Sequence, residues 1–309
     1  MTLGEARWPL ALFFITAAWA QPAFAAESGA VPWWIWPSAL FAVTLVLGVV
    51  AVVTGLGGGT LFVPVVAAFF PFHLDFVRGA GLLLALSGAL SAGPSLLRSG
   101  FASLQLAMPL ALIASVTSII GALIGLALPT KIVETALGIT ILALALLMWR
   151  TNKAEDRPTI APPDAWAAAL GMHGVYHDPS SGQQVSWQVH RTPTAFAAFS
   201  AIGLLAGMFG IGAGWANVSV FNLLMGAPLK LSVGSSGLLL SVVDTSAAWV
   251  YMHRGAVLPM LVAPSIIGVM LGAKIGVRLL AVLPGRAIRK ALIVLLLITG
   301  ARALLKGLL

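Results

Sequence analysis

The sequence has no cysteine, and only nine of its 309 residues are acidic. The first absence excludes a disulfide framework, thiolate chemistry and cysteine-based metal sites. Charged residues make up 8% of the chain, too few to cover the surface of a soluble protein of this length. The composition is 60% apolar and the mean hydropathy is +1.02. These values predict an all-α polytopic membrane protein.

Signatures of common enzymes are also missing. The sequence holds no His-Glu-x-x-His zinc motif, no Gly-x-Ser-x-Gly nucleophile elbow and no Gly-Lys-Ser/Thr ending of a P-loop. We therefore predict neither an enzyme nor a cofactor. The net charge of +8 comes from basic residues scattered at the ends of apolar segments. This pattern is typical of membrane orientation and does not indicate a nucleic-acid partner.

The first residues have the form of a targeting segment. Arg7 precedes an apolar run from Trp8 to Trp19, and Ala23-Phe24-Ala25 has the small-x-small form of a cleavage site. This pattern predicts a signal peptide over residues 1–25, which would leave the mature N-terminus outside. The alternative is an uncleaved anchor helix.

Two glycine runs organise the rest of the chain, Gly55-Leu56-Gly57-Gly58-Gly59-Thr60 and Gly210-Ile211-Gly212-Ala213-Gly214. They belong to a longer similarity at a constant offset of 155 residues, which also carries Gly48 to Gly203, Gly79 to Gly234, Pro109 to Pro264, Gly121 to Gly276 and Pro129 to Pro284. We interpret this as a duplication. It predicts a first transmembrane repeat over residues 33–150, a linker over 151–193 and a second repeat over 194–309.

Each repeat is predicted to hold five helical segments. They cover 33–54, 61–72, 76–97, 104–128 and 132–149, then 195–209, 215–225, 229–252, 257–283 and 287–305. The second segment of each copy is short, because a dozen helical residues span about 18 Å and a bilayer core is about 30 Å thick. These segments are predicted to be half-helices that start at the glycine runs, either crossing with a tilt or re-entrant.

An odd number of crossings per copy would give the repeats opposite orientation. With the mature N-terminus outside, eleven basic residues lie at inner ends and five at outer ends. The inner set is Arg98, Arg150, Lys153, Arg157, Arg191, Lys230, Lys274, Arg278, Arg286, Arg289 and Lys290, and the outer set is Arg78, Lys131, Arg254, Arg302 and Lys306. The positive-inside rule therefore predicts inverted repeats in the cytoplasmic (inner) membrane, with the linker in the cytoplasm.

The linker contains a predicted β-hairpin. Alternating segments over residues 172–177 and 184–189 flank the turn-rich Asp178-Pro179-Ser180-Ser181-Gly182. The histidines His173, His177 and His190 lie in or beside it. No acidic or cysteine ligand set accompanies them, so we predict no metal site.

The glycine-rich starts of the two short helices are the candidate binding site. A helix start presents unpaired N–H groups and the positive end of the helix dipole, which favour an anion. The candidate substrate-binding residues are Gly57, Gly58, Gly59, Thr60, Gly212, Ala213, Gly214 and Asn217. The competing interpretation is that the glycines only allow close helix packing in lipid.

Three ionisable residues complete the candidates. Asp244 is the acidic residue that lies well inside an apolar span, which suggests proton coupling, with a structural hydrogen bond as the alternative. Arg78 and Lys230 begin the third segment of each copy and could attract an anion. Snorkelling of their side chains to the membrane interface is the alternative.

The chain resembles the sulfite exporter TauE/SafE family of membrane transporters. The resemblance rests on residues 55–64 and 207–214, with Gly226-Ala227-Pro228-Leu229-Lys230, residues 254–257 and residues 268–273. It implies export of sulfite or a small organosulfonate. Asn217-Val218-Ser219 departs from the simple motif, which would place an apolar residue and proline there, and this makes the two halves unequal.

The residues and the resemblance together predict a secondary transporter for a small anion. The short helices would meet near the middle of the bundle, and rocking of one repeat against the other would alternate access to the site. A passive anion channel, an uptake permease for another small anion and a membrane scaffold are the alternatives. The sequence does not define the anion, the coupling ion or the oligomeric state.

Overall fold

The computed structural model describes residues 32, 34–54, 58–98, 102–150, 162–178, 183–212, 214–279 and 285–308. The predicted signal peptide over residues 1–25 lies outside the described residues. The first half of the chain forms the helices α2 (Ile35–Thr54), α3 (Gly58–Phe69), α4 (Leu74–Arg98), α5 (Leu104–Ala127) and α6 (Thr130–Arg150).

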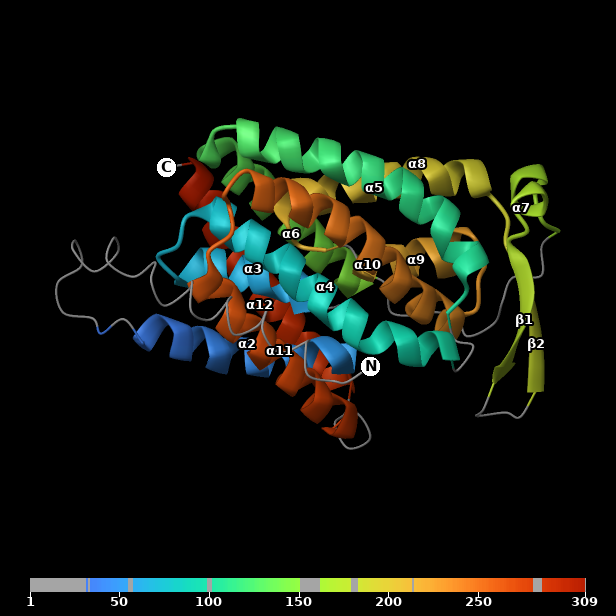
Figure 1. Cartoon of the computed structure of the whole chain (residues 1–309), viewed down its shortest axis with the longest axis horizontal. Coiled ribbons are helices and arrows are strands. Elements are labelled where there is room, and N and C mark those ends of the chain that lie inside the picture. The colour runs from blue at the N-terminus through green and yellow to red at the C-terminus, as the bar shows by residue number, and fades with distance from the viewer. Residues whose placement is uncertain are drawn as a thin grey trace, which may run out of the picture.

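A small module with a β-hairpin follows. It consists of a short helix α7 (Ala165–Ala169) and the strands β1 (His173–Asp178) and β2 (Gln183–Gln188). The strands are antiparallel, with His173 opposite Gln188 and Asp178 opposite Gln183. Figure 1 shows the hairpin beyond one end of the helical bundle, while the C-terminus lies at the other end. The sequence did not lead us to expect α7, because five residues are too few to show a helical period.

The second half contains α8 (Thr192–Phe209), α9 (Gly214–Ser219), the π-helical turn η2 (Val220–Leu224), α10 (Leu229–His253), α11 (Pro259–Leu279) and α12 (Gly285–Leu308). Its helices pack mainly on helices of the first half: α2 on α11, α5 on α8, α4 on α10 and α6 on α12. Figure 1 shows α5 and α8 running side by side along one edge of the bundle, with α2 and α11 at the opposite edge.

Glycines let these helix pairs approach closely. Where α5 crosses α8, an added Cβ on Gly121, Gly203 or Gly207 would overlap a backbone carbonyl of the facing helix. Gly48, Gly268 and Gly272 have the same role where α2 crosses α11. Small residues at crossings are typical of helices that associate in lipid, where packing and not the hydrophobic effect drives contact.

Three of the described helices are long and apolar enough to cross a bilayer: Leu104–Ala127, Thr192–Phe209 and Leu231–His253. Shorter apolar stretches occur at Ile35–Ala51, Gly58–Phe69 and Pro259–Ile275. Apolar side chains of the long helices also face outward, among them Leu112, Val116 and Trp249. Lipid is the surrounding in which such a surface is stable.

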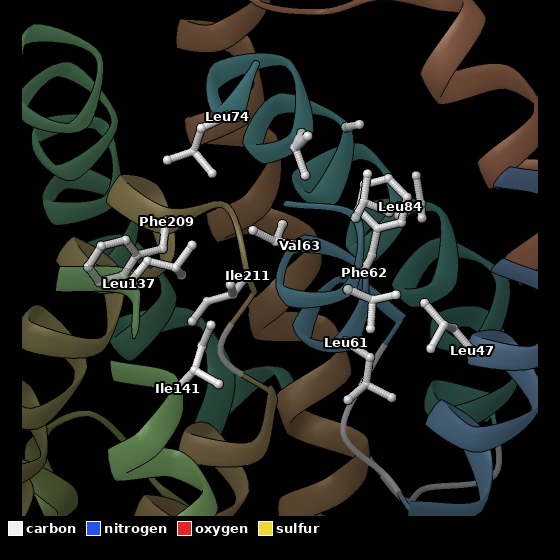
Figure 2. Close-up of a cluster of buried hydrophobic side chains, with 14 of the residues drawn as sticks. Leu47, Leu61, Phe62, Val63, Leu74, Leu84, Leu137, Ile141, Phe209 and Ile211 are labelled. Carbon is white, nitrogen blue, oxygen red and sulfur yellow. The ribbon is translucent and has the colours of Figure 1, made fainter. Parts of the chain in front are cut away.

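The short helix α3 lies in the interior of the bundle. Its residues from Gly59 to Val66 are all buried, and a helix that is apolar on every side belongs in a core. Figure 2 shows Phe62 and Val63 of α3 among side chains from other elements, with Ile211 of the second glycine run in the same cluster. α3 begins at Gly58, three residues before the predicted segment, so Gly58 and Gly59 form part of the helix.

The second short helix differs from its counterpart. A continuous helix over 215–225 was predicted, but the α-helical hydrogen bonds end at Ser219 and a π-helical turn follows. In this turn the Met225 N–H donates to the Val220 carbonyl at 3.0 Å, and the Asn222 side chain donates to the Ala227 carbonyl at 2.9 Å. The Asn222 bond holds the chain where the helix widens. π-helical turns are rare and frequently occur at functional sites.

The hairpin module is docked onto this second short helix. Met172, Trp187 and Val189 belong to the same buried cluster as Phe221 and Met225. The His190 N–H also donates to the Met225 carbonyl at 3.1 Å. The linker is therefore packed against the bundle at the end of η2.

Asp164 fastens the module to α8. Its carboxylate accepts hydrogen bonds from the Ala167 N–H at 2.7 Å and from the Thr192 N–H at 2.5 Å. Burial alone would raise the pKa of Asp164, but the two N–H donors outweigh it and hold the pKa below the ordinary 3.8. The carboxylate therefore stabilises the docked module at pH values above 3.8, and this stabilisation is lost as the pH falls through the lowered pKa.

We expect Asp164→Ala to loosen the module by about 1 kcal/mol, the usual cost of removing a helix N-cap. Hydrogen exchange should accelerate at the Ala167 and Thr192 amides in the variant. In the wild type the protection factors of these amides, which compare exchange with that of an unfolded chain at the same pH, should fall only in acid, below about pH 4. Exchange at these two amides that is equal in variant and wild type at neutral pH would contradict the assignment.

Candidate functional site

The first glycine run reaches α4 through Gly59. An added Cβ on Gly59 would lie 2.6 Å from the Gly81 carbonyl oxygen and 2.8 Å from the Ala85 Cβ. No side chain fits at this position, so the start of α3 lies directly on the backbone of α4. Thr60, the next residue, is buried.

The second glycine run forms the turn between α8 and α9. Gly210 and Gly212 have φ values of +67° and +57°, which only glycine adopts readily. The Gly210 N–H donates to the Ala206 carbonyl at 2.8 Å and ends α8. An added Cβ on Gly212 would lie 3.2 Å from the Ala85 Cβ.

Ala85 is thus the point at which the two glycine runs meet. Gly59 from the first half and Gly212 from the second half both lie against its methyl group. The structure therefore brings together two segments that are more than 150 residues apart in the sequence. Ala85 was not among the residues predicted from the sequence, because one alanine in an apolar helix has no distinguishing pattern.

Asp244 lies beside the same turn. A Cβ on Gly212 would be 3.6 Å from one Asp244 carboxyl oxygen and 4.0 Å from the other. The side chain is fully buried, and neither oxygen has a hydrogen-bond partner among the described residues. An unpaired carboxylate in such surroundings is costly, and a carboxyl group at this depth is by default a functional candidate.

Asn217 is a second buried polar group without partners. It lies in α9, one turn after Gly214, and neither its amide nitrogen nor its amide oxygen is hydrogen-bonded to a described residue. Gly214 is held by α10, because the Ser236 hydroxyl donates to its carbonyl at 3.3 Å. Buried amides are nearly always hydrogen-bonded in folded proteins. A polar ligand or water would satisfy Asn217.

Arg78 lies outside this group. Its guanidinium is 1% exposed and donates to the carbonyls of Met208 at 2.8 Å and Gly125 at 3.1 Å. It also forms an ion pair with Asp75. The side chain is therefore engaged with backbone and carboxylate oxygens.

Three candidate residues are not described in this detail. Gly57 and Ala213 lie outside the described residues, and Lys230 belongs to α10 without a described side chain. Gly58 is described, but an added Cβ there would meet Val269 of α11 and not the Gly212 turn. The described site is therefore formed by Gly59, Ala85, Gly212, Asp244 and the neighbouring α9.

Apolar helices that cross through glycines around buried polar groups define a helical membrane protein with a candidate site in its interior. The family comparison identifies which one. The family model for sulfite exporter TauE/SafE matches residues 39–303, and the chain belongs to this family. No curated protein and no solved structure matches the chain. The protein is thus a multi-pass membrane protein of a sulfur-anion transporter family.

Proposed function

We propose that this protein exports sulfite or a small organosulfonate across the cytoplasmic membrane by alternating access. The observation that carries the proposal is the meeting of Gly59 and Gly212 at Ala85, beside the unpaired Asp244. Two glycine segments that start short helices bring backbone N–H groups close to one point. Such a point can replace water around the oxygens of an anion.

The helix pairs support the duplication. At the 155-residue offset, α4 corresponds to α10 at both ends, α2 to α8, α5 to α11 and α6 to α12. The pairing of α2 with α11 then mirrors the pairing of α8 with α5. Reciprocal pairing of this kind is what two copies related by a pseudo-two-fold axis produce. Rocking of one copy against the other would open the interior site to each side in turn.

Membrane potential can drive the export. An anion that leaves a cell with a negative interior gains about 2.3 kcal/mol per charge at 100 mV, so a uniporter would suffice. Asp244 adds a proton route, because it lies against the Gly212 turn and has no described partner. We assign Asp244 the role of proton carrier. In the proposed topology the N-terminus lies outside and the hairpin lies in the cytoplasm.

The test is sulfite efflux from proteoliposomes under a set membrane potential. Wild-type flux should saturate with sulfite concentration. Ala85→Leu should reduce flux at least tenfold, because Gly59 and Gly212 already lie against the Ala85 methyl group and the larger side chain would push the two glycine segments apart. Gly88→Leu, one turn along α4, is the matched control, because an added Cβ there meets nothing within 4 Å.

Other results would redirect the assignment. Flux that never saturates would favour a passive anion channel over alternating access. If sulfite does not move, methanesulfonate, thiosulfate and small carboxylates should be tested in the same vesicles. Inward movement of one of these against its gradient would favour an uptake permease. Equal flux in wild type and Ala85→Leu would contradict the proposed position of the site.

A further inference from the structure

Arg78 and Tyr251 hold the end of α8 from which the second glycine turn departs. The last four carbonyls of a helix have no partner within the helix, and they carry the negative end of its dipole. In α8 these include Gly207 and Met208. Arg78 donates to the Met208 carbonyl at 2.8 Å, and the Tyr251 hydroxyl donates to Gly207 at 3.0 Å.

The same two side chains contact each other. The centre of the Arg78 guanidinium lies 5.6 Å from the centroid of the Tyr251 ring, within the range of a cation–π contact. Arg78 also donates to the Gly125 carbonyl at 3.1 Å, in the last turn of α5. One buried cation therefore binds the carbonyl ends of two helices, α5 and α8.

The Gly210 turn rests directly on this network. An added Cβ on Gly210 would lie 2.6 Å from the Arg78 Cα, so turn and helix are in backbone contact. Along α4, Arg78 lies two turns before Ala85, and along α10 Asp244 lies two turns before Tyr251. The network is thus about 10 Å from the interior site, at 1.5 Å per helical residue. Neither side chain is part of that site.

The other copy lacks the side chains that form this network. At the 155-residue offset, Arg78 corresponds to Val233, Asp75 to Lys230 and Tyr251 to Leu96. Val233 is an apolar side chain with 43% exposure, and it cannot donate to a helix end. Two copies that exchange conformations during transport would therefore not be equivalent, because a single end can form these hydrogen bonds.

We propose that Arg78 and Tyr251 are positioning residues that hold the α8 end and the Gly210–Gly212 turn in the observed state, closing the bundle at the end opposite the hairpin. This inference rests on the alternating access proposed above. Opening at that end has to break the hydrogen bonds to Gly207 and Met208. The network thus sets how often the protein opens there.

The test uses Tyr251→Phe, which removes the hydroxyl and keeps the ring. Hydrogen exchange in the peptide covering residues 206–212 should accelerate roughly five- to tenfold, the effect expected for the loss of one buried hydrogen bond. Ser246→Ala is the matched control, because the Ser246 hydroxyl donates within its own helix α10, to the Val242 carbonyl at 3.0 Å. Unchanged exchange in Tyr251→Phe would overturn the proposal.

A second readout separates an opening at one end from a general loosening. Because the chain has no cysteine, Ala85→Cys provides a single thiol at the interior site. A membrane-impermeant maleimide should label it faster in Tyr251→Phe when applied on the side opposite the hairpin, with no change from the hairpin side. Equal acceleration from both sides would show loss of fold stability and would count against the proposal.

These measurements do not require a known substrate. If exchange and one-sided labelling change as expected while sulfite does not move, the positioning role stands and the proposed function fails. If sulfite flux is normal while exchange and labelling are unaffected, the proposed function stands and the positioning role fails. Arg78→Lys should act in the same direction as Tyr251→Phe, because lysine lacks the fork that binds two carbonyls.

Discussion

Gly207→Val is expected to leave little folded protein in the membrane, the largest effect of any substitution considered. Its first added carbon would lie 2.7 Å from the Ser118 carbonyl carbon and 2.9 Å from the Ser118 Cα, both atoms of the facing helix α5. Backbone atoms cannot rotate away as a side chain can, so α5 and α8 would have to separate. Overpacking in a fixed core costs about 1–3 kcal/mol, and a backbone clash lies at the upper end or beyond.

The separation would extend beyond one contact. Gly121 and Gly203 lie in the same crossing, and the α8 end carries the Gly210 turn. A loss of this size is a large fraction of the roughly 5–15 kcal/mol that stabilises a typical fold. The measurement is the monodisperse fraction after extraction in mild detergent. Gly88→Val should behave as wild type, and a fully folded Gly207→Val would show that the crossing is looser than described.

Asp244→Asn is expected to uncouple sulfite efflux from the pH gradient and to leave efflux driven by membrane potential. Asparagine keeps the size of the side chain and removes its exchangeable carboxyl proton. In the wild type, one pH unit across the membrane is worth about 1.4 kcal/mol per proton, a tenfold change in the sulfite ratio at equilibrium. In the variant, this ratio should not respond to the pH gradient.

The control for Asp244→Asn is the same substitution at an aspartate outside the helical bundle. Asp164→Asn serves this purpose, because Asp164 binds the Thr192 N–H in the docked module, at the start of α8 and away from the Gly212 turn. It should retain the wild-type response to the pH gradient. An Asp244→Asn protein that still accumulates sulfite tenfold per pH unit would assign the proton to another group and leave Asp244 a structural role.

Much of the fold could be predicted from the sequence, because apolar length and glycine position are local signals. The predicted segment over 229–252 and helix α10, Leu229–His253, differ by one residue at one end. The 155-residue offset also aligns the bounds of α4 and α10. Family membership, inferred from the glycine motifs, was confirmed by the match over residues 39–303.

The site was harder to predict because its members are ordinary in the sequence. Asp244 stood out, because a carboxyl group in an apolar run is rare. Ala85 and Tyr251 did not, since their importance comes from helices that are distant in the chain. Arg78 looked like a residue at a helix end facing solvent or substrate, but it is enclosed because the carbonyls of Met208 and Gly125 lie close by. No local pattern contains such contacts.

Because the hairpin is docked on the second short helix, its position reports on that helix. Because the Met225 carbonyl binds the His190 N–H, and Trp187 shares a cluster with Phe221, a shift of the second short helix has to carry the hairpin with it. Val175 on β1 is 62% exposed and does not belong to that cluster. A dye attached at Val175 would move with the hairpin whenever the second short helix shifts. Single-molecule fluorescence could therefore follow each transport cycle from outside the bilayer.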